Sequence, residues 1–271
     1  MPSHSPAGPP ISVPELREKK RRGEKLVAVT AYDASFAVAS DAAGIDIVLV
    51  GDSLGMVIQG HASTLPVTVD QIVYHSASVA RGLSRALLIA DMPFLSARDA
   101  STALATARRL MGEGGAAMVK LEGSGWASDV IRALAERDVP VCAHLGLTPQ
   151  SVHKLGGFRV QGREEAAAAH LRAAAREVED AGADLLVLEC VPSPLAAEIT
   201  RDLRIPTIGI GAGADCDGQV LVMYDLIGLS RGRRPRFVKN FLAGNDSIVG
   251  ALSAYANAVR ARTFPDAEHS Y

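Results

Sequence analysis

Cysteine is scarce in this 271-residue chain, which carries only Cys142, Cys190 and Cys216. The three residues are far apart, and two of them lie inside apolar runs. They match neither a disulfide framework nor a zinc motif of the CxxC type. We therefore expect buried thiols in a reducing compartment.

Long apolar runs and a strong excess of one charge are also missing. No apolar run approaches the ~20 residues that a membrane-spanning helix needs, and the N-terminal MPSHSPAGPP lacks the apolar core of a signal peptide. The formal net charge is −2, which gives no sign of a polyanionic partner. The basic run at 231–236 favours a solvated loop over a phosphate clamp. We expect a cytoplasmic protein with no membrane or nucleic-acid partner.

Short apolar runs are what the chain has in quantity, and 48% of its residues are hydrophobic. Eight strand candidates lie at 25–33, 46–53, 86–93, 116–123, 139–147, 184–190, 205–213 and, more weakly, 218–229. Most are nearly continuous in apolar residues rather than alternating. This pattern is typical of strands buried on both faces of a parallel sheet.

Amphipathic or alanine-rich stretches separate these runs, for example at 68–82, 99–115 and 163–183, and each ends near glycine. The alternation predicts a parallel sheet with helices outside it. Eight strands in a chain of this length favour a single (β/α)₈ barrel of the TIM type, with a doubly wound sheet as the alternative. We expect residues 1–10 to form a flexible tail and 11–271 to form one barrel domain.

Charged residues stand at the ends of several of these runs. They are Asp52, Asp91, Lys120, Glu122, His144 and Glu189. In a barrel the C-terminal ends of all strands share one face, where active sites lie, so these side chains would converge. In a doubly wound sheet only those at the switch point would meet.

Carboxylates that lie close together repel one another unless a cation neutralises them. Magnesium prefers hard oxygen ligands and is often held by one or two carboxylates together with water and substrate oxygens. Asp52 and Asp91 are the predicted direct ligands, and Glu122 could bind directly or through water. The alternative is that each acid caps a helix or pairs with a surface base, which explains one acid better than it explains the whole set.

Lys120 and His144 each allow more than one role. Lys120 precedes Glu122 by two positions, so both side chains point to the same face of a strand. Lys120 could bind a substrate carboxylate, form a Schiff base, which requires a lowered pKa, or pair with an acid. His144 is either a hydrogen-bonded structural residue or part of the site.

A glycine-rich stretch, IGIGAGADCDG at 208–218, follows the seventh run. It does not fit the GxGxxG pattern of dinucleotide-binding folds. Its glycines are better explained by a close approach of the backbone to a ligand or to a neighbouring element.

Longer blocks of the sequence resemble the ketopantoate hydroxymethyltransferase family. They include VLVGDSLGMVIQGHASTLPVTVDQIVYH, LLIADMPF, MVKLEG, VPVCAHLGLTPQSVHKLGGFRVQGR and GADLLVLECVP, and the likeness runs from about residue 11 to the EHS near the end of the chain. The resemblance implies a (β/α)₈ barrel whose lower end is covered by an N-terminal helix, VPELREKKRRGE. It also implies a homo-oligomer, a decamer of two stacked rings.

The resemblance further implies the reaction and the site. The implied cofactor is one Mg²⁺ per subunit, and 5,10-methylenetetrahydrofolate donates a one-carbon unit to 3-methyl-2-oxobutanoate, giving 2-dehydropantoate in pantothenate biosynthesis. The positions that match the metal site of the family are Asp52, Asp91 and Glu122. Those that match the binding site of the keto acid are Asp52, Ser53, Asp91, Lys120 and His144. Glu189 matches the residue that transfers the proton. One departure is Tyr224, where some relatives have histidine, and it lies outside the metal set.

The residues and the resemblance agree on one mechanism. The metal would stabilise the enolate of the keto acid, and Glu189 would remove the C3 proton. The alternatives are a metal-dependent carbon–carbon lyase of the isocitrate lyase type, a Schiff-base aldolase using Lys120, and a barrel that binds the keto acid without turnover. Lyase assays, borohydride trapping and turnover measurements separate them.

Overall fold

Eight parallel strands form a closed barrel in the computed structural model, which describes residues 8–230 and 234–271. The strands are β1 (Leu26–Thr30), β2 (Ile47–Val50), β3 (Leu87–Asp91), β4 (Met118–Glu122), β5 (Val141–Gly146), β6 (Leu185–Glu189), β7 (Thr207–Ile210) and β8 (Gly218–Leu221). β1 pairs with both β2 and β8, which closes the ring. The predicted (β/α)₈ barrel is confirmed, and the doubly wound sheet is excluded.

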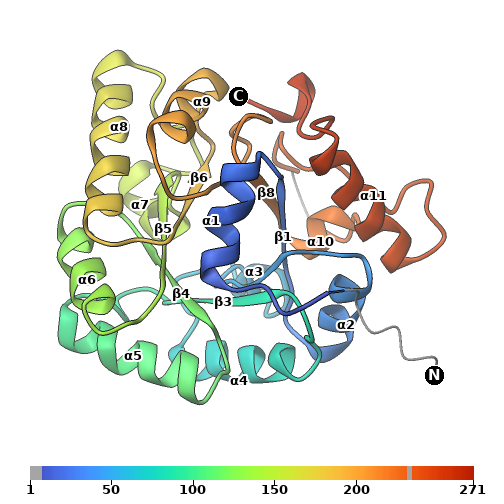
Figure 1. The fold of residues 1–271 in the computed structure, drawn as a ribbon, viewed down its shortest axis with the longest axis horizontal. Helices are drawn as coiled ribbons and strands as arrows, with labels where there is room; N and C mark the ends of the chain where they lie inside the picture. The colour runs from blue at the N-terminus through green and yellow to red at the C-terminus, as the bar shows by residue number, and fades with distance from the viewer. Residues whose placement is uncertain (1–7, 231–233) are drawn as a thin grey trace.

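Helices surround this ring (Figure 1). They are α1 (Val13–Arg22), α2 (Ala34–Ala42), α3 (Leu54–Val57), α4 (Val69–Ala80), α5 (Ala100–Gly112), α6 (Trp126–Ala135), α7 (Val152–Leu155), α8 (Glu165–Asp180), α9 (Ser193–Asp202), α10 (Met223–Leu226) and α11 (Ile248–Arg260), with 3₁₀ turns η1 (Pro149–Ser151) and η2 (Ala267–His269). Within the described ranges, no helix combines the length and the apolar character needed to span a membrane. Most of the predicted tail, and the first half of the 231–236 run, lie outside the described residues.

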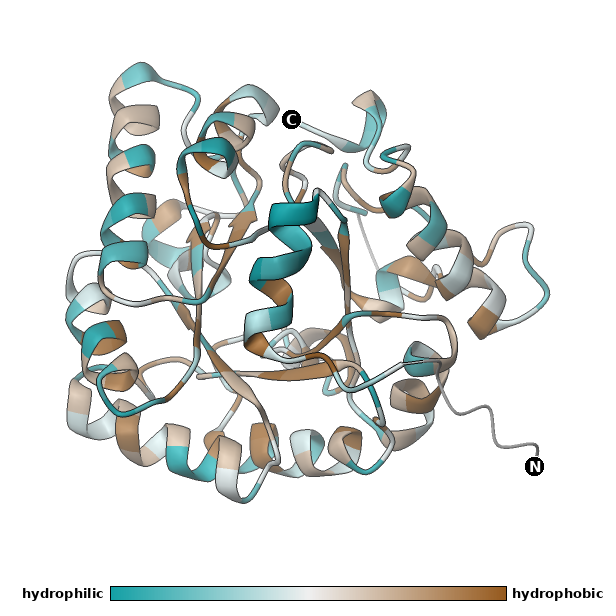
Figure 2. Cartoon of the chain, in the orientation of Figure 1, coloured by the Kyte–Doolittle hydropathy of each residue, from teal (hydrophilic) through white to brown (hydrophobic). Residues whose placement is uncertain are grey.

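Continuous apolar character fits strands that are covered on both sides. Every residue of β1, β3 and β4 is buried, and the strands are mostly brown in Figure 2, whereas the helices alternate brown and teal. The eighth apolar run was predicted too long, because the strand ends at Leu221 and the chain turns into α10. Met223 there donates its N–H to the Thr30 hydroxyl, so the second half of the run packs on the barrel as a helical turn.

The connection from β7 to β8 is a short segment, residues 211–217, to which the structure assigns no helix. It packs closely against β7: a Cβ added at Gly209 would lie 3.0 Å from the Cys216 sulfur. The buried Lys25 ammonium donates to the carbonyls of Ala214, Asp215 and Cys216 in this segment. The predicted role of these glycines in close backbone approach is confirmed for Gly209.

The N-terminal helix α1 lies across the N-terminal end of the barrel, as predicted, and Figure 1 shows it in front of the centre of the ring. Arg17 pairs with Asp184, just before β6, at 2.6 Å. Lys20 pairs with Asp217, just before β8, at 2.9 Å, and also donates to the carbonyls of Thr200 and Ile205. Because these partners all precede strands, α1 covers the end of the barrel opposite to the strand C-termini.

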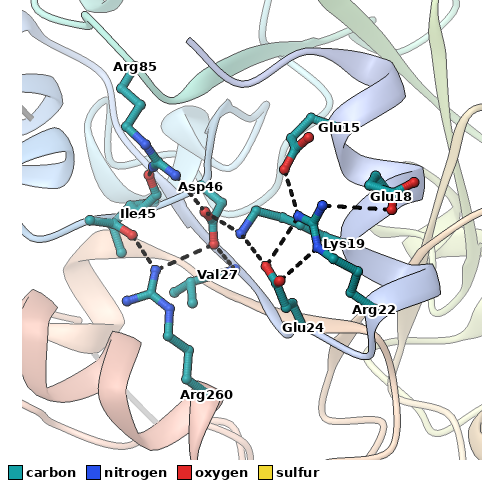
Figure 3. A network of polar contacts seen from close by, with 11 residues as sticks. Glu15, Glu18, Lys19, Arg22, Glu24, Val27, Ile45, Asp46, Arg85 and Arg260 are labelled. Carbon is teal, nitrogen blue, oxygen red and sulfur yellow. Dashed lines mark hydrogen bonds and ion pairs between the residues drawn. The ribbon is translucent and has the colours of Figure 1, made fainter. Parts of the chain in front are cut away.

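Asp46 connects several elements at this lower end (Figure 3). Its side chain is fully buried and accepts the Val27 N–H at 3.0 Å. Lys19, Arg85 and Arg260 bring their cationic groups to within 3.4–3.5 Å of its oxygens. A buried carboxylate is stable only when it is paired and hydrogen-bonded, and this one has three cations and a backbone donor.

We expect Asp46→Ala to lower the free energy of unfolding by ~3–5 kcal/mol, because it leaves the partly buried Lys19 and Arg85 cations and the Val27 N–H without this partner. Urea unfolding monitored by circular dichroism measures the loss. The matched control is Glu24→Ala, which removes an exposed acid of the same cluster that pairs with Arg22 and should leave the midpoint almost unchanged. Equal midpoint shifts for the two variants would contradict the central role of Asp46.

Candidate active site

The C-terminal ends of β2 to β6 bring the predicted site residues together. The strand register places Asp91 beside Lys120, Glu122 beside His144, and Gly146 beside Glu189. Asp52 and Ser53 follow β2 directly. Charged groups that are far apart in sequence therefore meet on one face of the barrel, which confirms the predicted convergence.

Asp91 and Lys120 form a buried ion pair, with Nζ 2.5 Å from Oδ1. Burial alone would lower the pKa of Lys120, but the charges of Asp91, Glu122 and Asp52 outweigh it and raise the pKa above its usual value. Lys120 is therefore a fixed cation in this arrangement. A raised pKa is the opposite of what a Schiff-base lysine requires.

Asp52 is also buried, and its backbone N–H donates to Asp91 Oδ2 at 2.9 Å. This approach depends on Gly51, where an added Cβ would lie 3.3 Å from that oxygen and 2.8 Å from the Ser53 hydroxyl. Burial, followed by the charges of Asp91 and Glu122, raises the pKa of Asp52 well above its usual range, although Lys120 and Gln150 oppose the shift. The neutral form of Asp52 is therefore favoured unless further positive charge lies beside the cluster.

His144 lies between two glutamates. Its Nδ1 is 3.4 Å from Glu122 Oε1, and its Nε2 is 3.3 Å from Glu189 Oε2. Neither contact has hydrogen-bond geometry, and within the described part of the chain both ring nitrogens and Glu122 Oε1 are without a hydrogen-bond partner. Burial and Lys120 lower the pKa of His144, but the two glutamates outweigh them and raise it to about 9. The two glutamates thus favour the charged form of the ring, which fits a structural ion pair as well as a role in the site.

Glu189 is the most accessible of these acids, with 14% of its side chain exposed, against 3% for Asp91 and 6% for Glu122. It ends β6 and lies on the far side of His144 from Glu122. A carboxylate in this position can exchange a proton with a ligand bound over the acids.

Two site residues were not identified from the sequence. Tyr32 follows β1, is buried, and forms a 2.9 Å hydrogen bond between its hydroxyl and that of Ser53. Gln150, in the turn after β5, donates to both Asp52 and Glu122. Both residues lie shortly after the end of a strand, and this position in the sequence could have identified them as candidates for the site. Tyr224, the departure from the family pattern, packs on Tyr32 with ring centroids 6.0 Å apart.

The donor set fits a hard divalent cation, although it does not form a closed cage. Asp52, Asp91 and Glu122 offer only oxygen atoms, and Glu122 Oε1 is buried without a hydrogen-bond partner among the described residues. Burial, together with the charges of Asp91 and Glu122, raises the pKa of Asp52. Among the described residues, no group of three or more His, Cys, Asp or Glu side chains is arranged to hold an ion by itself. Magnesium tolerates such a site, because water and substrate oxygens complete its coordination.

Comparisons with known structures agree with this fold. One similar structure is a crystal structure of 2,3-dimethylmalate lyase, which is described as a member of the PEP mutase/isocitrate lyase superfamily. Its TM-score is 0.58 at 19% sequence identity, and the match covers 78% of this chain and 81% of that one. A structure of phosphonopyruvate hydrolase gives a TM-score of 0.61 at 14% identity, covering 80% and 83%. At these identities the likeness shows the fold alone.

Sequence comparisons are more specific. Proteins named 3-methyl-2-oxobutanoate hydroxymethyltransferase from Marinobacter nauticus and Xylella fastidiosa are 59% and 60% identical to this chain. They cover 96% and 97% of it, and the matches span 98% and 96% of those proteins. The family model described as ketopantoate hydroxymethyltransferase matches residues 10–267. The chain therefore belongs to the ketopantoate hydroxymethyltransferase family.

Proposed function

We propose that this chain transfers a one-carbon unit from 5,10-methylenetetrahydrofolate to 3-methyl-2-oxobutanoate and forms 2-dehydropantoate, a step of pantothenate biosynthesis. The new carbon–carbon bond joins C3 of the keto acid to the methylene carbon, water supplies the hydroxyl oxygen, and tetrahydrofolate leaves. Family membership supports the reaction, and the names of the relatives support the choice of keto acid.

One observation carries the proposal at the level of the site. Three buried carboxylates, those of Asp52, Asp91 and Glu122, lie beside Lys120 and His144, with Glu189 on the outer side of the histidine. The deprotonation of a 2-oxo acid needs positive charge near the keto oxygen and the carboxylate, and a base near C3. In this arrangement Lys120, His144 and a bound cation would supply the positive charge, and Glu189 would serve as the base.

Asp52 and Asp91 would hold a Mg²⁺ ion directly, and Glu122 would hold it directly or through water. When bound, the ion supplies Lewis-acid polarisation of the keto and carboxylate oxygens and stabilises the charge that develops on deprotonation. The hard oxygen donors and the unpartnered Glu122 oxygen support this role.

Lys120, Ser53 and His144 would bind the keto acid. The Lys120 ammonium offers a fixed positive charge for the substrate carboxylate, as a buried lysine can. The Ser53 hydroxyl is oriented by Tyr32. The His144 ring, with its pKa raised to about 9, is a proton donor at neutral pH.

Glu189 would remove the C3 proton. Its carboxylate contacts the His144 ring at 3.3 Å and keeps partial exposure, so it can face a substrate that lies over the acids. The enolate then attacks the one-carbon unit. Of the alternatives, the raised pKa of Lys120 disfavours a Schiff-base aldolase, and the full-length family match favours transfer over carbon–carbon cleavage.

Glu189→Gln should slow exchange of the C3 proton of 3-methyl-2-oxobutanoate by roughly 10²–10⁴-fold, because the amide cannot accept the proton. Proton NMR in D₂O follows the exchange as the collapse of the methyl doublet. Keto-acid binding, measured by calorimetry, should stay largely unchanged. Glu136→Gln, an exposed acid on the outer helix layer, is the matched control. Wild-type exchange in Glu189→Gln would remove Glu189 from this role.

EDTA should abolish the same exchange, and added Mg²⁺ should restore it, since the buried acids need a cation to bind the anionic substrate. Borohydride added with the keto acid should leave Lys120 unmodified, which mass spectrometry checks. Exchange that survives EDTA, together with a borohydride adduct on Lys120, would establish the aldolase instead. Turnover of isocitrate or 2-methylisocitrate would establish a lyase.

A homodecamer and a cytoplasmic location, without a membrane or nucleic-acid partner, also belong to the proposal, on the basis of the family resemblance. Sedimentation equilibrium should give a mass about ten times the 28.4 kDa of one chain. A monomer or dimer across the measured concentrations would refute the decamer. It would leave the proposed chemistry intact, because all the site residues described above come from one chain.

A further inference from the structure

Gln150 makes three hydrogen bonds to the rim of the acid cluster. Its backbone N–H donates to Glu122 Oε2 at 3.0 Å. Its side-chain amide donates to Asp52 Oδ2 at 2.8 Å and to the Met92 carbonyl at 3.0 Å. One residue of the η1 turn therefore fixes groups at the C-terminal ends of β2, β3 and β4.

These bonds matter because the acids have few other donors. In the part of the chain that the structure describes, the Gln150 amide is the only hydrogen-bond donor to the Asp52 carboxylate. Glu122 receives a hydrogen bond on Oε2 alone, since its other oxygen has no partner. Repulsion among buried carboxylates favours moving them apart, and Gln150 opposes that movement for two of them at once.

The side chain at this position has to be neutral, and it has to donate. A carboxylate there would add another negative charge beside Asp52, and a lysine would place a fixed cation where a divalent ion has to bind. Glutamine gives both amide protons to fixed acceptors and adds no charge. It orders the acids without competing with an ion.

We propose that Gln150 is a positioning residue that holds Asp52 and Glu122 in place for the divalent cation. This inference rests on the cation site of the proposed function. Residues that hydrogen-bond to metal ligands commonly contribute 10- to 100-fold to metal affinity, roughly the size expected here. Because Gln150 belongs to the turn after β5, it also ties that turn to the site.

The test is the affinity for Mn²⁺, a paramagnetic substitute for Mg²⁺, measured by electron paramagnetic resonance without substrate. Gln150→Met keeps the length of the side chain, removes its amide donors to Asp52 and Met92, and retains the backbone N–H that binds Glu122. It should weaken Mn²⁺ binding by roughly 10- to 100-fold. Gln150→Lys should weaken it further, because it adds a cation beside Asp52. The matched control is Gln161→Ala, whose amide donates only to the exposed Arg159 carbonyl, and it should bind as the wild type does.

The outcomes separate the two hypotheses. If the wild type binds Mn²⁺ and Gln150→Met binds equally well, the Gln150 side chain has no positioning role at Asp52, and the proposal fails. The same conclusion follows if Gln150→Lys binds as tightly as the wild type. If the wild type itself does not bind Mn²⁺, the cation site of the proposed function fails. Urea midpoints that match the wild type should accompany the loss of affinity, and a large drop in the midpoint of Gln150→Met would instead assign the residue to the stability of the fold.

Discussion

The ion pair between Asp91 and Lys120 is the interaction on which the rest of the site depends. Both side chains are buried, and they meet at 2.5 Å. Without the ammonium, Asp52, Asp91 and Glu122 would be three buried carboxylates with His144 as their remaining cation, a costly arrangement in a low-dielectric interior. Lys120 makes it possible to gather the acids. In the proposed function a divalent ion would offset the negative charge that remains, and together with Lys120 it would attract the anionic substrate.

Two aspartates at opposite ends of β2 differ in the cations and hydrogen-bond donors around their carboxylates. The difference suits a structural role for one and the proposed cation site for the other. Asp46, just before the strand, has three cations and a backbone donor. Asp52, just after it, accepts only from the neutral Gln150 amide among the described residues, and its neighbours are acids. The first carboxylate is fully compensated within the chain. In the proposed function, a divalent ion would complete the surroundings of the second.

The barrel could be predicted from the sequence because continuous apolar runs recur between amphipathic stretches, and the site could be predicted because charged residues follow those runs. The resemblance added the roles of Ser53 and Glu189. The end of β8 was misplaced, since an apolar run does not distinguish a strand from the buried face of α10. Gln150 was missed because its partner Asp52 lies 98 residues away, and only the closed ring brings them together.

The helix α1 also has a consequence for how the chain can be altered. Its contacts with the ends that precede β6 and β8 cover the lower side of the barrel, opposite to the face on which the acids lie. The two ends of the barrel therefore carry separate tasks. A substitution in α1 would act on the stability of the barrel and leave the geometry of the acid cluster unchanged.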